Sequence, residues 1–203
     1  MKFYQMSDKI LLETWDGKER PVLYKKSHDF MQTKTGSIFI DYTNNENGEP
    51  FKGALICELD DEDQTGNLPT FFMSPALIGT KQFCQDLLSI GVDNIEVHPV
   101  IIRDTVNDRD INDYVVLNVL GRVSCADMDQ SDYEQLNDEA NPDHPNECMN
   151  CINDLVIDSH KLIDLDLFLV REDTDCIIVS ERVFQHIKGK GYSDIFFEEV
   201  KQI

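Results

Sequence analysis

The sequence predicts an α+β fold that combines a mixed or antiparallel sheet with a few short helices. Most of its apolar runs are short and rich in β-branched residues, which is typical of strands. Two stretches, which begin at Thr80 and Ser180, instead space their apolar residues as a helix does. The chain has 203 residues and is 41% hydrophobic, so residues 1–203 can form a single domain with a core of ordinary size.

The strand predictions follow the apolar runs in chain order. Valine, isoleucine and aromatic residues predict strands at residues 36–43, 53–59, 97–104 and 113–124. Three further short strands are expected before the last helix, at residues 154–162, 166–173 and 175–181. Asparagine, aspartate, glycine and proline predict loops at residues 44–50 and 137–147. The chain should therefore contain more strand than helix.

The two predicted helices belong to an internal repeat, because residues 80–100 align without a gap with residues 180–200. Thr80 and Ser180 are suitable N-caps, since a hydroxyl can accept hydrogen bonds from the open N–H groups of the first turn. Gly91 and Gly191 stand where a left-handed residue ends a helix. We therefore predict a duplicated helix–turn–strand unit, with a chance similarity of two amphipathic helices as the alternative. The matched apolar residues are Phe83, Cys84, Leu87, Ile95, Val97 and Val100 in the first copy and Val183, Phe184, Ile187, Ile195, Phe197 and Val200 in the second.

Negative charge dominates the chain, whose formal net charge is −21. Nucleic acids and anionic membranes are bound by basic patches, so neither is an expected partner. The charge is also concentrated, since residues 124–160 hold ten Asp and Glu and no Lys or Arg. Such a surface attracts a basic partner, although solubility alone is another explanation of an acidic chain.

The acidic segment supplies the candidate partner-binding residues. A buried group of carboxylates would need matching cations, and the segment contains none, so these side chains are expected to be exposed. We further expect some of them to contact a basic partner. The candidate residues are Asp127, Asp129, Asp132, Glu134, Asp138 and Glu139.

Six cysteines raise the question of disulfides or metal. Residues 1–20 contain no apolar leader, which favours a cytoplasmic protein with reduced thiols. The cysteines that lie inside apolar runs are expected in the core, and they are Cys57, Cys84 and Cys176.

Cys148 and Cys151 are the best metal candidates, with His144 and His160 nearby. Structural zinc usually has four nitrogen or sulfur ligands in two close pairs, and here the second pair is missing. We therefore expect no cofactor. An intracellular metal-binding or regulatory module that uses Cys148 and Cys151 is the alternative function.

An enzyme is not expected. The chain has no Gly-x-Ser-x-Gly, no phosphate-binding glycine loop and no His-Glu-x-x-His. No apolar run approaches the roughly 20 residues that span a bilayer.

Several segments of residues 70–203 resemble a known family. Ser74 and Pro75 precede a helix and "GVDNIEVHPV"; then come "DYVVLNVLGRVSCADMDQS", "DLVIDSHKLIDLDLFLVRE" and "IIVSERVFQHIKGKGYSDIFFEEV". In this order they resemble the bacterial immunity proteins of polymorphic-toxin systems, family eleven of that series. Residues 1–65 show no such match.

The resemblance implies a small cytoplasmic protein that binds a cognate toxin and blocks its active surface. It implies an inhibitor and not an enzyme. A basic nuclease is one candidate toxin, since an acidic inhibitor can compete for a face that binds nucleic acid. The family alone does not name the toxin's activity.

Overall fold

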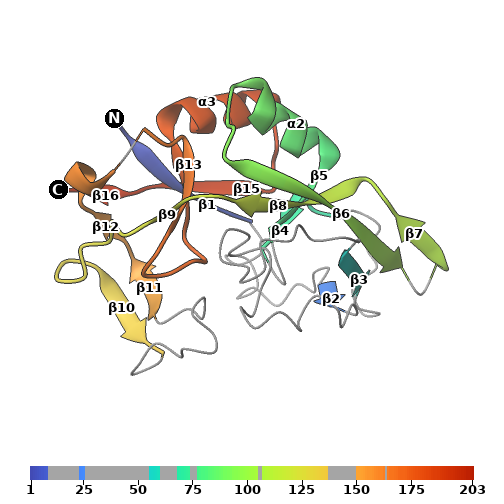
Figure 1. Ribbon diagram of the computed structural model, residues 1–203, viewed down its shortest axis with the longest axis horizontal. Coiled ribbons are helices and arrows are strands. Elements are labelled where there is room, and N and C mark those ends of the chain that lie inside the picture. Colours follow the sequence, from blue (N-terminus) through green and yellow to red (C-terminus); the bar gives the residue numbers. More distant parts are fainter. Residues whose placement is uncertain are drawn as a thin grey trace, which may run out of the picture.

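The structure is a computed structural model that describes residues 1–8, 23–25, 55–59, 68–73, 77–104, 107–136, 150–162 and 164–203. The predicted α+β class is confirmed, because the described chain combines two α-helices with several mixed sheets (Figure 1). The helices are α2 (Lys81–Ser89) and α3 (Glu181–Lys190).

The described strands form two larger and two smaller sheets (Figure 1). The seven-stranded sheet contains, in spatial order, β2 (Leu23–Lys25), β3 (Leu55–Leu59), β6 (Ile95–Asp104), β8 (Tyr114–Val119), β5 (Ile78–Thr80) and β4 (Phe71–Phe72), with β7 (Arg109–Ile111) paired to β6. The five-stranded sheet has the order β15 (Ile195–Glu199), β1 (Phe3–Asp8), β14 (Ile177–Ser180), β13 (Leu167–Val170) and β9 (Arg122–Val123). The two-stranded sheets are β10 (Asp132–Gln135) with β11 (Asn150–Asp154), and β12 (Val156–Ile157) with β16 (Lys201–Gln202).

Most strand predictions that fall on described residues are confirmed. The strands predicted at 53–59, 97–104, 166–173 and 175–181 correspond to β3, β6, β13 and β14. The predicted strand at 36–43 and the predicted loops at 44–50 and 137–147 lie outside the described residues.

Two strand predictions need correction. The run 113–124 is not one strand but two, because β8 pairs with β5 and β6 whereas Arg122 and Val123 of β9 pair with β13. The run 154–162 is a strand only over β12. It continues as a short 3-10 helix, Ser159–Lys161, because the Asp158 carboxylate accepts from the His160 N–H at 3.0 Å.

Both helices begin and end as their sequences predict. The Thr80 hydroxyl accepts from the Phe83 N–H at 3.2 Å, and the Ser180 hydroxyl accepts from the Val183 N–H at 3.4 Å. Gly91 and Gly191 have positive φ angles of 85° and 80°, which glycine adopts without steric cost.

The helix–turn–strand units sit in the same topology. β8 lies between β5 and β6 and pairs antiparallel with each of them, and α2 connects β5 to β6. In the same way, β1 lies between β14 and β15 and pairs antiparallel with each of them, and α3 connects β14 to β15. The registers also correspond. The equivalent pairs are Thr80–Tyr114 and Ile95–Val119 in one unit, and Ser180–Phe3 and Ile195–Asp8 in the other.

The correspondence extends to the neighbouring strands. β3 runs parallel to β6 with Ile56 opposite Ile101, and β12 runs parallel to β16 with Val156 opposite Lys201. Each residue of the second pair follows its counterpart by one hundred positions. β4 and β13 likewise lie antiparallel beside β5 and β14. We call β2–β6 with β8 the first half, and β12–β16 with β1 and the bridge residue Ala126 the second half.

The second half is completed by the opposite end of the chain. β1 lies between β14 and β15, and the Val200 N–H donates to the Phe3 carbonyl at 3.0 Å. The two chain ends therefore meet on one side of the molecule (Figure 1). The sequence analysis did not predict β1, although the alternation of polar and apolar residues in "FYQMSD" is compatible with a strand.

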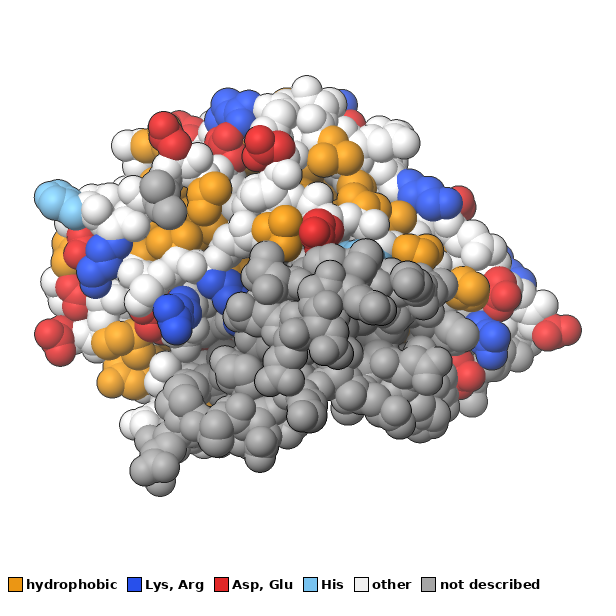
Figure 2. Space-filling view, in the orientation of Figure 1, with side chains coloured by type: hydrophobic (Ala, Val, Ile, Leu, Met, Phe, Trp, Pro, Cys, Tyr) orange, Lys and Arg blue, Asp and Glu red, His pale blue; other side chains and the backbone are white. Residues whose placement is uncertain are grey.

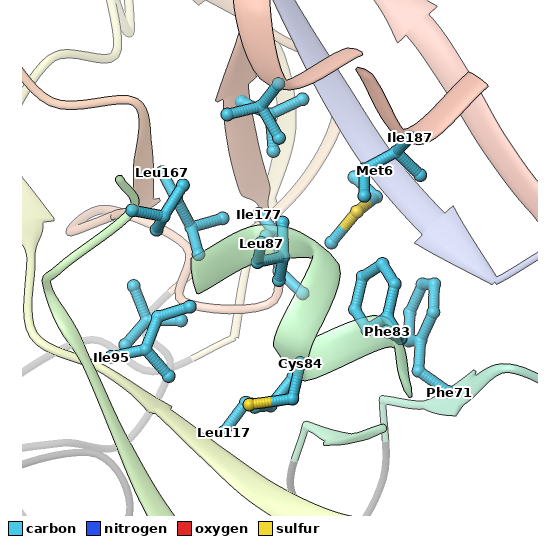
Figure 3. Close-up of a cluster of buried hydrophobic side chains, with 14 of the residues drawn as sticks. Met6, Phe71, Phe83, Cys84, Leu87, Ile95, Leu117, Leu167, Ile177 and Ile187 are labelled. Atoms are coloured by element: carbon cyan, nitrogen blue, oxygen red, sulfur yellow. The ribbon is translucent and has the colours of Figure 1, made fainter. Parts of the chain in front are cut away.

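The main core joins both halves. α2 and α3 lie next to each other on one face of the strands, and their apolar sides point into a single cluster (Figures 1 and 3). Leu87 and Ile187 are both 0% exposed. The cysteines predicted in the core, Cys57, Cys84 and Cys176, are buried.

A polar contact also connects the helices across the halves. Asp86 of α2 is buried, and its carboxylate accepts from Lys190 Nζ at 2.8 Å, Tyr192 Oη at 2.7 Å and Gln82 Nε2 at 3.2 Å. Burial alone would raise the pKa of Asp86, but these hydrogen bonds and the Lys190 charge lower it below its usual value. The carboxylate is therefore charged and paired at neutral pH.

Candidate functional site: the acidic hairpin

The predicted acidic residues that the structure describes lie on and just before a β-hairpin. We call β10 and β11 the acidic hairpin. It forms a two-stranded sheet separate from the two larger sheets, and it projects from the body on the side away from α2 and α3 (Figure 1). Asp138 and Glu139 lie outside the described residues.

Asp127 has a structural role at the start of this region. Its Oδ1 accepts from the N–H groups of Asp129 at 3.0 Å and Gln130 at 3.2 Å, and its carbonyl accepts from the Ser131 N–H at 2.8 Å. The Asp127 N–H in turn donates to the Val156 carbonyl at 2.8 Å. This turn directs the chain from the body into β10. Asp127 is therefore only partly exposed, which corrects the expectation that it is exposed.

The other described candidates are exposed as predicted. Asp129, Asp132 and Glu134 are all exposed, and every residue of β10 is exposed. Asp132 lies opposite Asp154 and Glu134 lies opposite Cys151, with a register shift between Asp132 and Tyr133. Carboxylates thus gather on the hairpin without burial.

The inner strand β11 is attached to the body by defined hydrogen bonds. The Ile152 N–H donates to Oδ2 of the buried Asp173 at 2.8 Å, and Asn150 Nδ2 donates to the Glu172 carbonyl at 3.0 Å. The Ile152 side chain is also buried in an apolar cluster beside Leu155 and Val170. β11 is therefore held in place, and β10 is the outward strand.

Few cations offset the charge of the hairpin. Lys201 of β16 forms an ion pair with Asp154, and the acidic segment itself supplies no Lys or Arg. On the face of the molecule that Figure 2 shows, acidic and basic side chains are interspersed. The described hairpin thus carries Asp132, Glu134 and Asp154, and Lys201 pairs with the last of them.

The acidic segment also exposes two apolar side chains that the sequence analysis did not single out. Tyr133 is 38% exposed and Leu136 is 55% exposed. The sequence offered a signal for both. That signal is the presence of two large apolar residues in a segment whose charged residues are all acidic.

Only two of the weak metal candidates lie in the described chain, Cys151 and His160, and both are exposed. Burial, and then the negative charges of Asp173, Glu134 and Asp175, raise the pKa of Cys151. A raised pKa keeps the thiol protonated, which disfavours metal binding and nucleophilic attack. Among the residues that the structure describes, no group of three or more His, Cys, Asp or Glu could hold a metal ion.

The described helices were also compared with the length and hydropathy that a membrane span requires. None of them is long and apolar enough to cross a bilayer.

The comparison with known families identifies one match. A model described as "Immunity protein family (Imm11)" matches residues 57–202. The match begins earlier than the resemblance at residues 70–203, and it covers the acidic hairpin, α2 and α3 while leaving out β1 and β2. No curated protein matches the chain.

Proposed function

The chain belongs to the immunity protein family Imm11, and on that premise we propose that it binds one cognate bacterial toxin and neutralises it by covering its active surface. The family match over residues 57–202 is the observation that carries this proposal. Immunity proteins are generally inhibitors and not enzymes, which agrees with the lack of a catalytic motif in the sequence.

The acidic segment is the proposed contact region. Asp129, Asp132 and Glu134 are exposed and close to one another along the chain, with Asp138 and Glu139 following in the same segment. Opposite charges on two partners speed their encounter and suppress wrong partners. We therefore propose a basic toxin domain, with a nuclease as one candidate, and a cytoplasmic site of action.

Residues 1–203 are proposed to act as one domain, although the family model covers only part of them. β1 lies outside the matched residues, yet it pairs with β14 and β15 inside the five-stranded sheet. Removing it would leave two matched strands without their shared partner. The immunity function should therefore require the N-terminal strand as well as the family-like part.

Protection in living cells tests the proposal. Each gene adjacent to this one is expressed from an inducible promoter in a bacterial host, with or without this chain, and a gene that stops growth is taken to encode the candidate toxin. We expect the toxin to stop growth and the chain to restore it, and we expect the two proteins to co-purify. Loss of growth that is identical in both strains, with no complex recovered, would reject the proposed function.

A further inference from the structure

The two halves of the fold show that the charge of the acidic hairpin is not a requirement of the architecture. In the first half, β2 lies antiparallel to β3 with Lys25 opposite Cys57. In the second half, Ala126 forms an antiparallel bridge to Ile157, which is the counterpart of Cys57. Residues 26–54 and residues 127–154 therefore join equivalent pairs of chain segments, and they are of nearly equal length.

These two connections differ sharply in charge. Residues 26–54 contain four acidic and three basic residues, whereas residues 127–154 contain nine acidic and no basic residues. The equivalent connection in the first half, residues 26–54, thus has almost balanced charge. Because clustered like charges destabilise a compact state, the acidity of the second connection calls for a cause outside the fold.

The strand β10 offers a specific docking feature. Its described neighbour is β11 alone, and the two form a two-stranded sheet, so no described strand covers the outer edge of β10. Exposed strand edges pair readily with another extended chain unless they are blocked, most often by lysine, proline or a bulge. β10 has a register shift at Asp132 and Tyr133, but its charged side chains are all acidic.

The side chains along β10 select the partner. Tyr133 and Leu136 provide exposed apolar surface, and tyrosine is among the residues that contribute most to binding at interfaces. Asp132 and Glu134 flank Tyr133 in the sequence and would repel a second copy of this chain, whose net charge is −21. The same two carboxylates would attract lysine and arginine.

We propose that the outer edge of β10 receives an extended, lysine- or arginine-rich segment of the toxin by strand addition. Main-chain hydrogen bonds to β10 would give affinity, as in other cases of strand addition. Tyr133 and Leu136 contact the apolar parts of the segment, and Asp132 and Glu134 pair with its cations. This inference rests on the proposed function, since it specifies how the toxin is held.

Substitutions on β10 test the inference against a control with the same change in net charge. The test variants are Tyr133→Ala and the double variant Asp132→Lys with Glu134→Lys. The matched control is Asp93→Lys with Glu198→Lys, because both residues are exposed and lie away from the hairpin. All are measured against the purified toxin by calorimetry or surface binding, after thermal unfolding has shown that each variant folds.

We expect Tyr133→Ala to weaken toxin binding about 30-fold, which is typical of a residue that dominates an interface. The charge reversal on β10 should weaken binding by at least about tenfold, and the control should stay within about threefold. Unchanged binding in both β10 variants would place the toxin contact elsewhere and overturn the inference, while leaving the immunity function intact. Failure of the wild-type chain to bind the toxin would instead reject the proposed function itself.

Amide hydrogen exchange tests strand addition directly. On addition of toxin, the outward-pointing amides among residues 132–136, which do not bond to β11, should exchange at least about tenfold more slowly, since new main-chain hydrogen bonds protect them. Unchanged exchange there would reject strand addition. A free wild-type dimer that the β10 charge reversal dissociates would also overturn the inference, because the edge would then pair with a second copy.

Discussion

Truncation of Leu87 to alanine tests whether α2 points this residue into the main core. Leu87 lies in α2, is 0% exposed, and belongs to a cluster with Met6 of β1 and Ile187 of α3 (Figure 3). A buried Leu→Ala change typically costs about 2–5 kcal/mol, and the cost is larger where the surroundings cannot collapse. Here the walls come from both helices and both large sheets, so we expect about 3–4 kcal/mol.

That loss is large enough to measure by thermal and urea unfolding. For a chain of this size, each kcal/mol lowers Tm by about 2–4 °C, so Leu87→Ala should lower Tm by about 6–16 °C. Leu88→Ala is the matched control, because Leu88 is the next residue of the same helix and is 43% exposed. Its cost should stay within about 0.5 kcal/mol. Equal costs for the two variants would refute the inward face assigned to α2. Ile187→Ala should repeat the result for α3.

Further expectations concern the cross-helix contact, the N-terminal strand and metal. The neighbours of Asp86 hold its pKa below its unfolded value near 3.9, so its stabilising effect is complete at neutral pH and is lost as the pH falls below about 4. The difference in unfolding free energy between wild type and Asp86→Asn should accordingly shrink between about pH 5 and pH 3, and a constant difference would refute the pairing with Lys190. Deletion of residues 1–8 should abolish cooperative thermal unfolding, because β1 joins β14 to β15; a cooperative transition near the wild-type Tm would contradict this. Elemental analysis should find no stoichiometric zinc, whereas one zinc per chain that is lost in Cys148→Ser would support the metal-binding alternative.

Local sequence patterns predicted the parts of the fold whose signals lie close together in the chain. The caps Thr80 and Ser180, the apolar spacing behind them and the glycines at the helix ends all act within a few residues, and both helices are as expected. The repeat is longer than residues 80–100 and 180–200 suggested. The segments "LICEL" at 55–59 and "LVIDS" at 155–159 also align at the same offset, and they contain β3 and β12.

Long-range pairing explains most of what sequence patterns missed. β1 has a central place only because β14 and β15, from the far end of the chain, enclose it. The break between β8 and β9 follows from the pairing of β9 with β13, which no local pattern contains. β10 was overlooked because "DYEQ" is too acidic to resemble a strand. The exposure of Asp129, Asp132 and Glu134 was predictable from charge alone, whereas the edge strand beneath two of them was not.

The central claim, that this chain neutralises a toxin by binding it, is tested most directly by titrating the purified chain into the purified toxin. The toxin's activity is followed while a parallel calorimetric titration measures binding. We predict that activity falls in proportion to added chain and is abolished near one chain per toxin, with a matching binding stoichiometry. Full toxin activity in the presence of a tenfold excess of folded chain, with no heat of binding, would contradict the account.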